Sequence, residues 1–547
     1  MTATDAAPRA ADIRLVVAAS AAGTAFEWYD FFVFGTLASI IARQFTGTNE
    51  TAGFIFALGA FAAGFFVRPF GALFFGHIGD RTGRKGAFLI TIVLMGLATI
   101  GIGLLPTVAQ AGMWAPALLV LMRVIQGFAM GGEYGGAAIY VAEHSDPARR
   151  GFFTSWIQTT ASLGLILALL VIFATRSLLG EDAFQAWGWR VPFLLSAVLL
   201  GVSLWIRLQL EESPVFRKMK AEQGVAKAPL AEAFGKAANL RLVLLALVAI
   251  MFGQGAVWYT AHFYAQFFLE RVLKVDAVTV NLVLSAAVLC SAPLYVFFGW
   301  LSDRLGRKPV MLTGMLLVVV SLFPAFHLLT AVGNPGLADA ARRAPVIVVA
   351  TPESCALQFD VLGRRAFTSA CDVAKRLLSN AGVPYVPESA PAGASVVIRI
   401  GAAEVPVPSL AGMDAAGAAA LRAATDEAVK ATLRSSGYPL SADPARVNEL
   451  GIFGVLLLLM IGAAALYGPQ AAALVELFPT RIRYSAFSLP YNVGTGWIGG
   501  FLPVTAFAMV AASGDLYFGL WYPLVFTSIS VLAMLFLLPE TRGRPLH

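Results

Sequence analysis

Long apolar runs separated by short charged loops make up most of the chain. A helix needs about 20 apolar residues to cross a bilayer, and twelve runs of this kind can be traced along the 547 residues. They lie at 14–44, 51–77, 87–106, 113–142, 152–176, 188–209, 242–270, 277–301, 309–332, 449–476, 485–512 and 517–538. The pattern predicts an all-α membrane protein with twelve transmembrane helices.

One segment, 333–448, loses this hydrophobic character and contains eleven basic and ten acidic residues. Within it, the stretches APVIVVAT and ASVVIRI have the composition of strands, and FTSACDVAKRLLSNAG has that of a helix. A second helix is expected to begin after Asp414 as N-cap and to end near Gly437. The segment is therefore predicted to be a small α+β insert between helices 9 and 10.

A ten-residue loop motif occurs twice in the chain. GHIGDRTGRK begins at Gly76, and GWLSDRLGRK begins 223 positions later, at Gly299. Glu143 and Arg150, which follow helix 4, have counterparts 333 positions later, after helix 10. The offset of 333 is larger than the offset of 223 because the insert lies after the second loop motif and before Glu476. A repeat at half of the helix count predicts two six-helix halves, a 6+6 pseudo-repeat.

The charge of the loops predicts the topology. Eighteen Lys and Arg residues lie in one set of short loops and the tail, and few lie in the opposite set. Because cytoplasmic loops are basic, both termini are predicted to lie inside the cell and the insert outside it. The expected parts are an N-terminal six-helix bundle (1–210), a cytoplasmic linker (211–241), C-terminal bundle helices 7–9 (242–332), the extracytoplasmic insert (333–448) and C-terminal bundle helices 10–12 (449–547).

The composition supports a membrane protein and excludes other classes. Hydrophobic residues make up 58% of the chain and charged residues 13%, whereas soluble proteins have about 25% charged residues. The mean hydropathy is +0.75. These values argue against a soluble enzyme, a disordered protein and a nucleic-acid binder. The net charge of +7 then reflects basic cytoplasmic loops rather than an acidic partner.

Ionisable residues inside a membrane are costly and are therefore functional candidates. Helix 1 contains FEWYDFF, in which Glu27 and Asp30 are three positions apart. A carboxyl group near mid-membrane, such as that of Asp30, can exchange protons near neutral pH. The proton-coupling candidates are Asp30, Glu27 and, in helix 4, Glu133. The alternative for Asp30 is a structural carboxylate paired with an arginine of another helix.

Helix 4 contains RVIQGFAMGGEYGG, which places Arg123 and Gln126 roughly on one face. A guanidinium in the outer half of the membrane can hold a substrate carboxylate in a bidentate pair. An ion pair of Arg123 with a helix 1 carboxylate is the alternative, and the two readings are compatible. On the same helix Gly127, Gly131 and Gly135 form a ridge of small residues that predicts close contact with another helix.

Helix 7 is apolar overall, yet Gln254, Trp258, Tyr259 and His262 could line an aqueous cavity there. The substrate-binding candidates are these four residues together with Arg123, Gln126, Tyr29 and Asn492. A lone membrane histidine is, however, more often a satisfied hydrogen-bonding residue than a titrating one. Arg68, towards the inner end of helix 2, is expected to snorkel or to pair rather than to bind substrate.

The two DRxGRK loops lie at the cytoplasmic face, away from a mid-membrane site. Each aspartate can accept hydrogen bonds from a neighbouring helix N-terminus or pair with arginine, and so hold the two halves together. The alternative is a basic anchor at the cytoplasmic face. The gate candidates are Asp80, Arg81, Arg84, Asp303, Arg304 and Arg307.

The chain has three cysteines, too few for a disulfide framework. Cys355 and Cys371 both lie in the insert, where an oxidising exterior favours a disulfide worth roughly 3 kcal/mol. Two free thiols are the alternative. Cys290 in helix 8 is expected to be a packing residue. The insert has no His and no Trp, so neither a zinc site nor a His-based hydrolase is expected there.

The repeated loop motif, with its spacing, resembles that of major facilitator superfamily transporters over about 1–332 and 449–547. The stretches EWYDF, VRPFGALFFGHIGDRTGRK, RVIQGFAMGGEYGGAAIYVAEHSDPARRGFFTSW, WGWRVPF, EESPVF and ELFPTRIRYSAFSLPYNVG together resemble the metabolite:proton symporter family. The insert, with ESCALQFD and SACDVAK, is similar to that of haloacid and acetate permeases within this family.

The resemblance implies a major facilitator fold in a bacterial inner membrane and alternating access driven by the proton gradient. It also implies that Asp30 and Arg123 are coupling and binding residues, and that the loop from Asp80 to Arg84 is a gate.

The expected function is a proton symporter that imports a small organic acid, in particular a short-chain monocarboxylate or haloacid. The alternatives are a dicarboxylate, 2-oxoglutarate, shikimate or proline/betaine symporter and, from another class, a membrane sensor that uses the insert as ligand-binding domain. The expected partners are the organic acid, protons and the lipid bilayer. No cofactor, metal, nucleic acid or enzymatic activity is expected, and the protein is expected to be a monomer.

Overall fold

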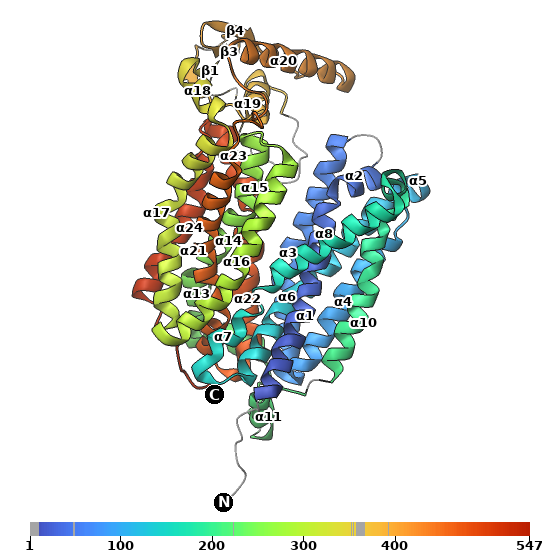
Figure 1. Ribbon diagram of the computed structural model, residues 1–547, viewed down its shortest axis with the longest axis vertical. Helices are drawn as coiled ribbons and strands as arrows, with labels where there is room; N and C mark the ends of the chain where they lie inside the picture. Colours follow the sequence, from blue (N-terminus) through green and yellow to red (C-terminus); the bar gives the residue numbers. More distant parts are fainter. Residues whose placement is uncertain are drawn as a thin grey trace, which may run out of the picture.

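Two bundles of long helices stand side by side, and a small α+β insert lies on one end of the C-terminal bundle (Figure 1). The computed structural model describes residues 10–46, 50–209, 211–222, 224–351, 353, 355–356, 367–391 and 393–546. The described chain begins and ends at the end of the bundles opposite the insert. We call this the terminal end, and the other the insert end.

The N-terminal bundle is formed by the first half of the chain. Its long helices are α1 (Ala10–Thr36), α3 (Glu50–Thr82), α4 (Arg84–Leu104), α6 (Trp114–His144), α8 (Thr160–Leu179) and α10 (Arg190–Leu208). Shorter helices extend or connect them: α2 (Ala38–Thr46), α5 (Val108–Ala111), α7 (Arg150–Ser155) and α9 (Glu181–Ala183). The linker to the second bundle contains α11 (Pro214–Ala221) and α12 (Pro229–Gly235).

The C-terminal bundle has the same kind of architecture. Its uninterrupted helices are α16 (Ala277–Leu305), α17 (Arg307–Gly333), α21 (Glu449–Leu477) and α24 (Trp521–Phe536). Segments of π-helix join α13 (Ala237–Ala246), α14 (Phe252–Tyr259) and α15 (Ala265–Phe267) into one helical stretch that ends at Val272. Another, Val493–Gly499, leads from α22 (Arg483–Asn492) towards α23 (Leu502–Ser513). Such segments are frequent at functional sites.

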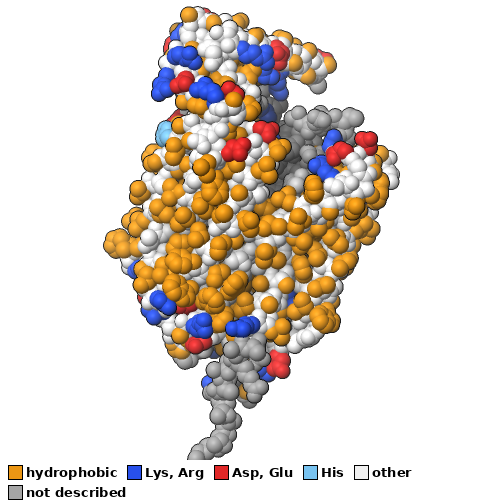
Figure 2. Space-filling model, viewed as in Figure 1, with side chains coloured by type: hydrophobic (Ala, Val, Ile, Leu, Met, Phe, Trp, Pro, Cys, Tyr) orange, Lys and Arg blue, Asp and Glu red, His pale blue; other side chains and the backbone are white. Residues whose placement is uncertain are grey.

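Ten helical stretches among the described residues are long and apolar enough to cross a membrane. They coincide with the third to twelfth predicted spans, and the long helices α1 and α3 coincide with the first two. On the face shown in Figure 2, hydrophobic side chains cover the middle of both bundles, whereas charged side chains gather towards the two ends and on the insert. The predicted helical membrane protein is confirmed, whereas the count of twelve membrane helices stays a prediction.

The insert contains a four-stranded sheet in the order β2-β1-β3-β4. Its strands are β1 (Val346–Ala350), β2 (Val386–Ser389), β3 (Val397–Ile400) and β4 (Ala403–Pro406). β1 pairs parallel to β2 and antiparallel to β3, and β3 pairs antiparallel to β4. The helices of the insert are α18 (Pro335–Arg343), α19 (Ala370–Ala381), which connects β1 to β2, and α20 (Ala415–Ser435).

The predicted α+β character of the insert is confirmed, with two additions. The expected strands are β1 and β3, whereas β2 and β4 were not predicted. Each of these is a four-residue edge strand that contains a proline, VPES and AEVP, and neither has the pattern of a central strand. Helix α18 was also not predicted. As expected, the Asp414 side chain caps α20 by accepting a hydrogen bond from the backbone N–H of Gly417.

Hydrogen bonds fasten the insert to the C-terminal bundle. The backbone N–H of Tyr385 donates to the carbonyl oxygen of Gly514 at 3.0 Å, just beyond α23. Nearby, Lys375 Nζ donates to the carbonyl oxygen of Ala512 at 3.2 Å. At the end of the stretch that contains α14, the carbonyl oxygen of Lys274 accepts from the backbone N–H of Ala442 at 2.9 Å. The insert is therefore held at the insert ends of two membrane helices.

Glycines allow α3 and α6 to pack backbone against backbone. A Cβ atom added at Gly127 would lie 2.0 Å from the carbonyl oxygen of Gly64, and one at Gly131 would lie 2.2 Å from that of Arg68. Gly135 continues this ridge and faces the Ser488 side chain of α22. The predicted ridge of small residues thus lies at a contact between helices.

We expect Gly127→Leu to destabilise the protein, because the added side chain would force α3 and α6 apart. Overpacking of this kind typically costs about 1–3 kcal/mol. Gly201→Leu is the matched control on α10, since an added Cβ has nothing within 4 Å there. The unfolding temperature of the detergent-solubilised variants measures the effect. An equal loss for both variants would contradict the packing argument.

Candidate transport site

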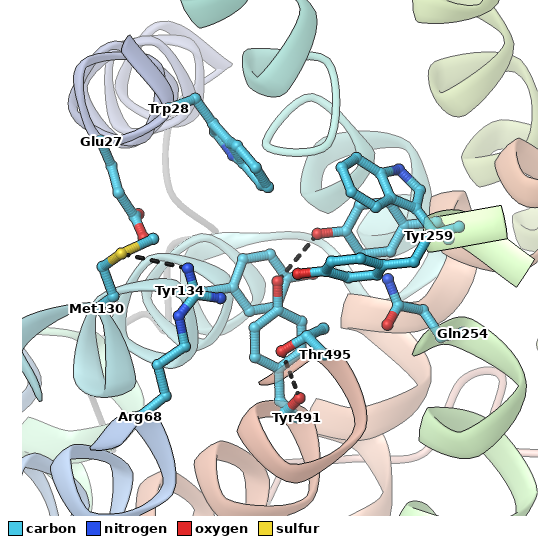
Figure 3. A pocket seen from close by; sticks show the side chains of 11 residues that line it. Glu27, Trp28, Arg68, Met130, Tyr134, Gln254, Tyr259, Tyr491 and Thr495 are labelled. Carbon is cyan, nitrogen blue, oxygen red and sulfur yellow. Dashed lines mark hydrogen bonds between the residues drawn. The ribbon is translucent and has the colours of Figure 1, made fainter. Parts of the chain in front are cut away.

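A small cavity of about 20 Å³ lies between the two bundles. The N-terminal half contributes side chains from α1, α3 and α6, and the C-terminal half from α14, α21, α22 and the π-helical segment after it. The lining residues are Glu27, Trp28, Arg68, Met130, Tyr134, Gln254, Trp258, Tyr259, Tyr467, Tyr491 and Thr495 (Figure 3). A cavity shared by both halves is the expected location of a transporter's substrate site.

Two charged side chains of opposite sign face this cavity. Figure 3 shows Glu27 and Arg68 on the same side, with Met130 between them. Glu27 Oε2 is buried without a hydrogen-bond partner. Arg68 Nη2 lies 3.2 Å from the Met130 sulfur, and its guanidinium lies over the Phe65 ring at 4.4 Å. Within the described part of the chain, neither charge has an oppositely charged group within the 4.0 Å of an ion pair.

Aromatic rings form much of the remaining wall. Tyr134 of α6 stacks on Tyr491 of α22, with ring centroids 3.9 Å apart. The hydroxyl groups of Tyr491 and Tyr467 are hydrogen-bonded at 3.0 Å. Trp28 of α1 and Trp258 of α14 approach each other at 5.7 Å between centroids. These rings bring the two halves together around the cavity and give it a mostly apolar surface with hydroxyl groups at fixed places.

Asp30 lies in a separate polar cluster inside the N-terminal bundle. Its carboxylate accepts hydrogen bonds from the hydroxyl groups of Thr99 at 2.9 Å and Ser196 at 2.6 Å. Gln126 Nε2 donates to the same Thr99 oxygen at 2.7 Å, and Arg123 Nη1 donates to Gln126 Oε1 at 2.7 Å. A chain of hydrogen bonds thus links Arg123 to Asp30 through two neutral side chains.

Arg68 lines the cavity, although Arg123 was the arginine expected there. Arg123 packs its guanidinium over the Phe34 ring at 4.0 Å and does not belong to the cavity lining, whereas Arg68 does. The sequence does not reveal this difference, because it depends on how α3 and α6 are rotated against their neighbours.

The other predicted binding residues divide between the cavity and its surroundings. Gln254, Trp258 and Tyr259 line it, as expected for the polar residues of helix 7. Tyr29, His262 and Asn492 do not: their side chains are hydrogen-bonded to the backbone oxygens of Pro192, Trp258 and Gly131, respectively. Five further lining residues were not predicted from the sequence: Trp28, Tyr134, Tyr467, Tyr491 and Thr495. Tyrosines within apolar helices were the available signal for three of them.

At the terminal end, the two repeated loops make equivalent contacts across the bundles. Asp80 accepts hydrogen bonds from the backbone N–H groups of Tyr484 at 3.0 Å and Ser485 at 2.9 Å, in the first turn of α22. It also accepts one from Arg84 Nη1 at 2.7 Å. A carboxylate in this position satisfies the free N–H groups of the helix and complements its dipole.

The second loop repeats this arrangement from the other half. Asp303 accepts from the backbone N–H groups of Gly151 at 2.9 Å and Phe152 at 2.7 Å, in the first turn of α7. Arg307 Nη1 donates to Asp303 at 2.6 Å. Of the predicted gate residues, Arg81 and Arg304 are exposed and lie outside these contacts.

Buried ion pairs connect the halves beside each loop. Glu143 of α6 pairs with Arg483 of α22 at 2.8 Å, and Glu476 of α21 pairs with Arg150 of α7 at 2.8 Å. Arg307 also approaches Glu476 at 3.3 Å. Each pair joins the glutamate of one copy of the weaker sequence repeat to the arginine of the other copy.

Two further glutamates, which were not predicted from the sequence, accept hydrogen bonds from the repeated loops at the terminal end. Glu212 accepts from the backbone N–H of Arg84 at 3.1 Å, and Glu540 accepts from that of Arg307 at 2.9 Å. Gly83 and Gly306 precede these arginines with φ angles of 130° and 112°, which a side chain rarely adopts. Burial favours the protonated form of Glu540, but backbone N–H donors outweigh it and hold the pKa of Glu540 below its usual value.

The structure joins Cys355 to Cys371 by a disulfide, with Cα atoms 5.2 Å apart. Cys371 lies in the first turn of α19, so the bond ties the loop after β1 to that helix. Cys290 of α16 has a free thiol and is exposed rather than packed inside the bundle. Among the described residues, no group of His, Cys, Asp or Glu side chains has the arrangement of a metal site.

A family model described as sugar (and other) transporter matches residues 15–245 and 432–547. This chain belongs to that family. The unmatched stretch between the two matched segments contains most of the insert.

Curated relatives are also transporters. The glycine betaine/proline/ectoine/pipecolic acid transporter OusA of Dickeya dadantii is 28% identical over 98% of this chain and 85% of the relative. The proline/betaine transporter of Salmonella typhimurium is 35% identical over 58% of this chain and 65% of the relative. The shikimate transporter of Escherichia coli is 36% identical over 57% of this chain and 72% of the relative.

Solved structures identify the fold. The proton:xylose symporter XylE, a major facilitator superfamily protein, matches over 98% of both chains with a TM-score of 0.64 and 15% identity. A double tryptophan mutant of XylE matches with a TM-score of 0.63 and 14% identity. At these identities the likeness establishes the fold alone. The expected major facilitator fold is confirmed, and the protein is a multi-pass membrane transporter.

We expect Glu476→Gln to destabilise the protein strongly, because it leaves the buried guanidinium groups of Arg150 and Arg307 without their shared carboxylate. Removing one partner of a buried ion pair typically costs about 3–5 kcal/mol. Glu211→Gln is the control, since its pair with Arg217 is exposed and exposed pairs contribute about 0–1 kcal/mol. Thermal unfolding in detergent measures both variants, and similar unfolding temperatures for the two would refute the assignment.

Proposed function

We propose that the protein is a proton symporter that imports a small organic acid, with a short-chain monocarboxylate or haloacid as the favoured substrate. The observation that carries this proposal is the presence of Glu27 and Arg68 in one cavity without a mutual ion pair. A guanidinium there can hold a carboxylate through two parallel hydrogen bonds. The aromatic walls suit the apolar part of a small acid.

The coupling follows from the charges in the cavity. With Glu27 ionised, the cavity already holds one negative and one positive group, and an incoming anion would add an uncompensated charge in a low-dielectric site. A proton on Glu27 removes its negative charge and leaves Arg68 available for the substrate carboxylate. Proton and anion therefore favour each other's binding, which is the thermodynamic requirement for symport.

Asp30 is proposed as a second proton-binding residue. It is buried one turn from Glu27 on α1, and its hydrogen bonds to Thr99 and Ser196 come from hydroxyl groups. Hydroxyl groups can donate to a carboxylate or accept from a carboxylic acid, so both forms of Asp30 can be accommodated. Arg123, at the end of the same chain of hydrogen bonds, positions this cluster rather than contacting the substrate.

The terminal end is proposed to be the cytoplasmic face, in accordance with the basic loops found there. Asp80 and Asp303 would then form the cytoplasmic gate together with Arg84 and Arg307. In the described conformation their contacts to α22 and α7 join the two halves at this end. Release of both contacts would let the bundles rock apart and expose the cavity to the cytoplasm.

A zwitterionic solute is the second candidate, because Glu27, Trp28 and Trp258 lie together in the cavity. A carboxylate and aromatic faces can recognise a quaternary or secondary ammonium group, while Arg68 holds the carboxylate of the same molecule. The relatives named for proline and betaine make this the alternative to test first.

Uptake into proteoliposomes under an imposed pH gradient, inside alkaline, tests the proposal. We expect accumulation of radiolabelled acetate to follow the gradient and to stop when a protonophore collapses it. Competition by chloroacetate, propionate, shikimate, 2-oxoglutarate, proline and betaine then ranks the substrates. Uptake that ignores the gradient would exclude proton coupling, and competition by betaine but not chloroacetate would favour the second candidate.

For Arg68→Gln we expect the KM of acid uptake to rise about 10- to 100-fold, because a charge-assisted hydrogen bond typically contributes about 1.5–3 kcal/mol. Arg43→Gln is the control, since Arg43 is exposed and bonds to Gln185 away from the cavity. A normal KM for Arg68→Gln would remove Arg68 from the substrate site.

For Asp30→Asn we expect loss of gradient-driven accumulation, because the amide cannot exchange a proton. Exchange of internal for external substrate should survive in part, since this exchange needs no net proton movement. Thr24→Val is the control on the same helix, because the Thr24 hydroxyl only donates to the Ser20 carbonyl oxygen. Retained accumulation in Asp30→Asn would remove Asp30 from the proton path.

A further inference from the structure

A second small cavity, also of about 20 Å³, lies within the N-terminal bundle. Three carboxyl side chains line it: Glu27 and Asp30 from α1, and Glu133 from α6. Glu27 therefore borders both cavities, since it also lines the cavity between the bundles. Apolar side chains of α4 and α10, such as Met95 and Leu199, form much of the remaining wall.

Glu133 differs from the other two acids in that it forms an ion pair with a cationic side chain. Arg207 Nη2 of α10 lies 3.3 Å from Glu133 Oε1, and both side chains are at most 1% exposed. The second carboxylate oxygen, Oε2, is buried without a hydrogen-bond partner. One oxygen is thus held by the cation while the other remains available for a proton.

The packing reserves a place for the Arg207 guanidinium. It lies over the Phe88 ring at 3.6 Å. A Cβ atom at Gly23 of α1 would lie 1.8 Å from Arg207 Nη2, so a side chain there would displace the guanidinium from this position. An arginine buried at this depth needs such a built site, because its burial is otherwise costly.

The pair also adjoins the terminal-end contacts. The Tyr484 hydroxyl donates to the carbonyl oxygen of Gly132, the residue before Glu133, at 2.8 Å. The backbone N–H of the same tyrosine donates to Asp80. The charged and titratable groups that face Glu133 are Glu27 and Asp30 from α1, Arg207 from α10 and Tyr484 from α22; Arg68 from α3 faces Glu27.

We propose that the proton leaves the substrate cavity through this second cavity, passing from Glu27 to Glu133, and that Arg207 is the positioning residue that makes Glu133 release it. The proposal rests on the proposed proton symport. In the first step the proton moves from the Glu27 carboxyl group to Glu133 Oε2, directly or through water. In the second it passes to solvent when the terminal end opens, and the Glu133 carboxylate pairs again with Arg207.

The role of Arg207 follows from electrostatics. A cation beside a carboxylate favours the ionised form, so Arg207 makes Glu133 a better proton donor towards the terminal end. Without the cation, Glu133 would retain its proton at neutral internal pH, and the return step would slow. Substrate and proton thereby use separate routes that meet at Glu27.

The test compares net uptake with exchange in proteoliposomes, with the best acid of the competition panel as substrate. For Arg207→Gln we expect net uptake at internal pH 7 to fall at least about tenfold, while substrate exchange stays within about twofold of wild type. Raising the internal pH by about two units should restore net uptake, because alkali removes the retained proton. Arg207→Lys should restore most of the activity at neutral pH, since it keeps the positive charge.

Arg190→Gln is the matched control, because Arg190 lies on the same helix but donates to the carbonyl oxygens of Gly103 and Leu105. Its pH profile should match that of wild type. An equal loss of exchange and net uptake in Arg207→Gln, or an unchanged pH profile, would overturn the proposal. Wild-type uptake that does not respond to a pH gradient would instead overturn the proposed function itself.

A chemical readout keeps the proposal testable if the variant transports poorly. Dicyclohexylcarbodiimide modifies protonated buried carboxyl groups, and peptide mass spectrometry reports the modification of Glu133. We expect Arg207→Gln to increase labelling of Glu133 at pH 7 several-fold relative to wild type and Arg190→Gln. Unchanged labelling in folded Arg207→Gln protein would contradict the role of Arg207.

Discussion

The free-energy cost of an ionised group in a low-dielectric interior is the constraint on which the structure depends. At the terminal end, the carboxylates of Asp80 and Asp303 offset that cost with backbone N–H and guanidinium donors. In the cavity between the bundles, Glu27 Oε2 is buried without a hydrogen-bond donor, and neither Glu27 nor Arg68 has an oppositely charged partner within the described chain. The paired carboxylates at the terminal end offset this cost within the protein, whereas the proposed substrate and proton would offset it in the cavity.

The pseudo-repeat makes the closure cooperative. Each half presents one loop aspartate to the first turn of a helix in the other half. Glu143 of the N-terminal half pairs with Arg483 of the C-terminal half, and Glu476 of the C-terminal half pairs with Arg150 of the N-terminal half. All of these contacts cross the boundary between the two halves. When one ion pair breaks, the charged group that loses its partner stays buried at this boundary, and the neighbouring contacts are weakened. A closed state that depends on several such contacts opens as a unit, which suits a carrier that alternates between two conformations.

The sequence predicted the helices well because apolar runs and loop charge are strong signals. Because the motif is repeated, it also pointed to Asp80 and Asp303 as residues that accept hydrogen bonds from helix N-termini, whereas their role as a gate stays a proposal. It predicted the cavity in part, since Trp258 and Tyr259 stand out in an apolar helix. It could not distinguish Arg68 from Arg123, because the rotation of one helix against another is set by packing. Arg207 was missed since it lies near the predicted end of helix 6, where arginines ordinarily reach the lipid headgroups.

The insert projects from one end of the C-terminal bundle (Figure 1). Its sheet and α19 are fastened to the insert ends of helices that belong to the C-terminal bundle. Helix α20 extends past the edge of that bundle on the side of the N-terminal one (Figure 1). In the proposed alternating-access cycle, a body fixed to one of the two halves converts a small rotation inside the bilayer into a larger displacement in water. Fluorophores on α20 and α2 would therefore follow individual transport cycles in single molecules without a label inside the membrane.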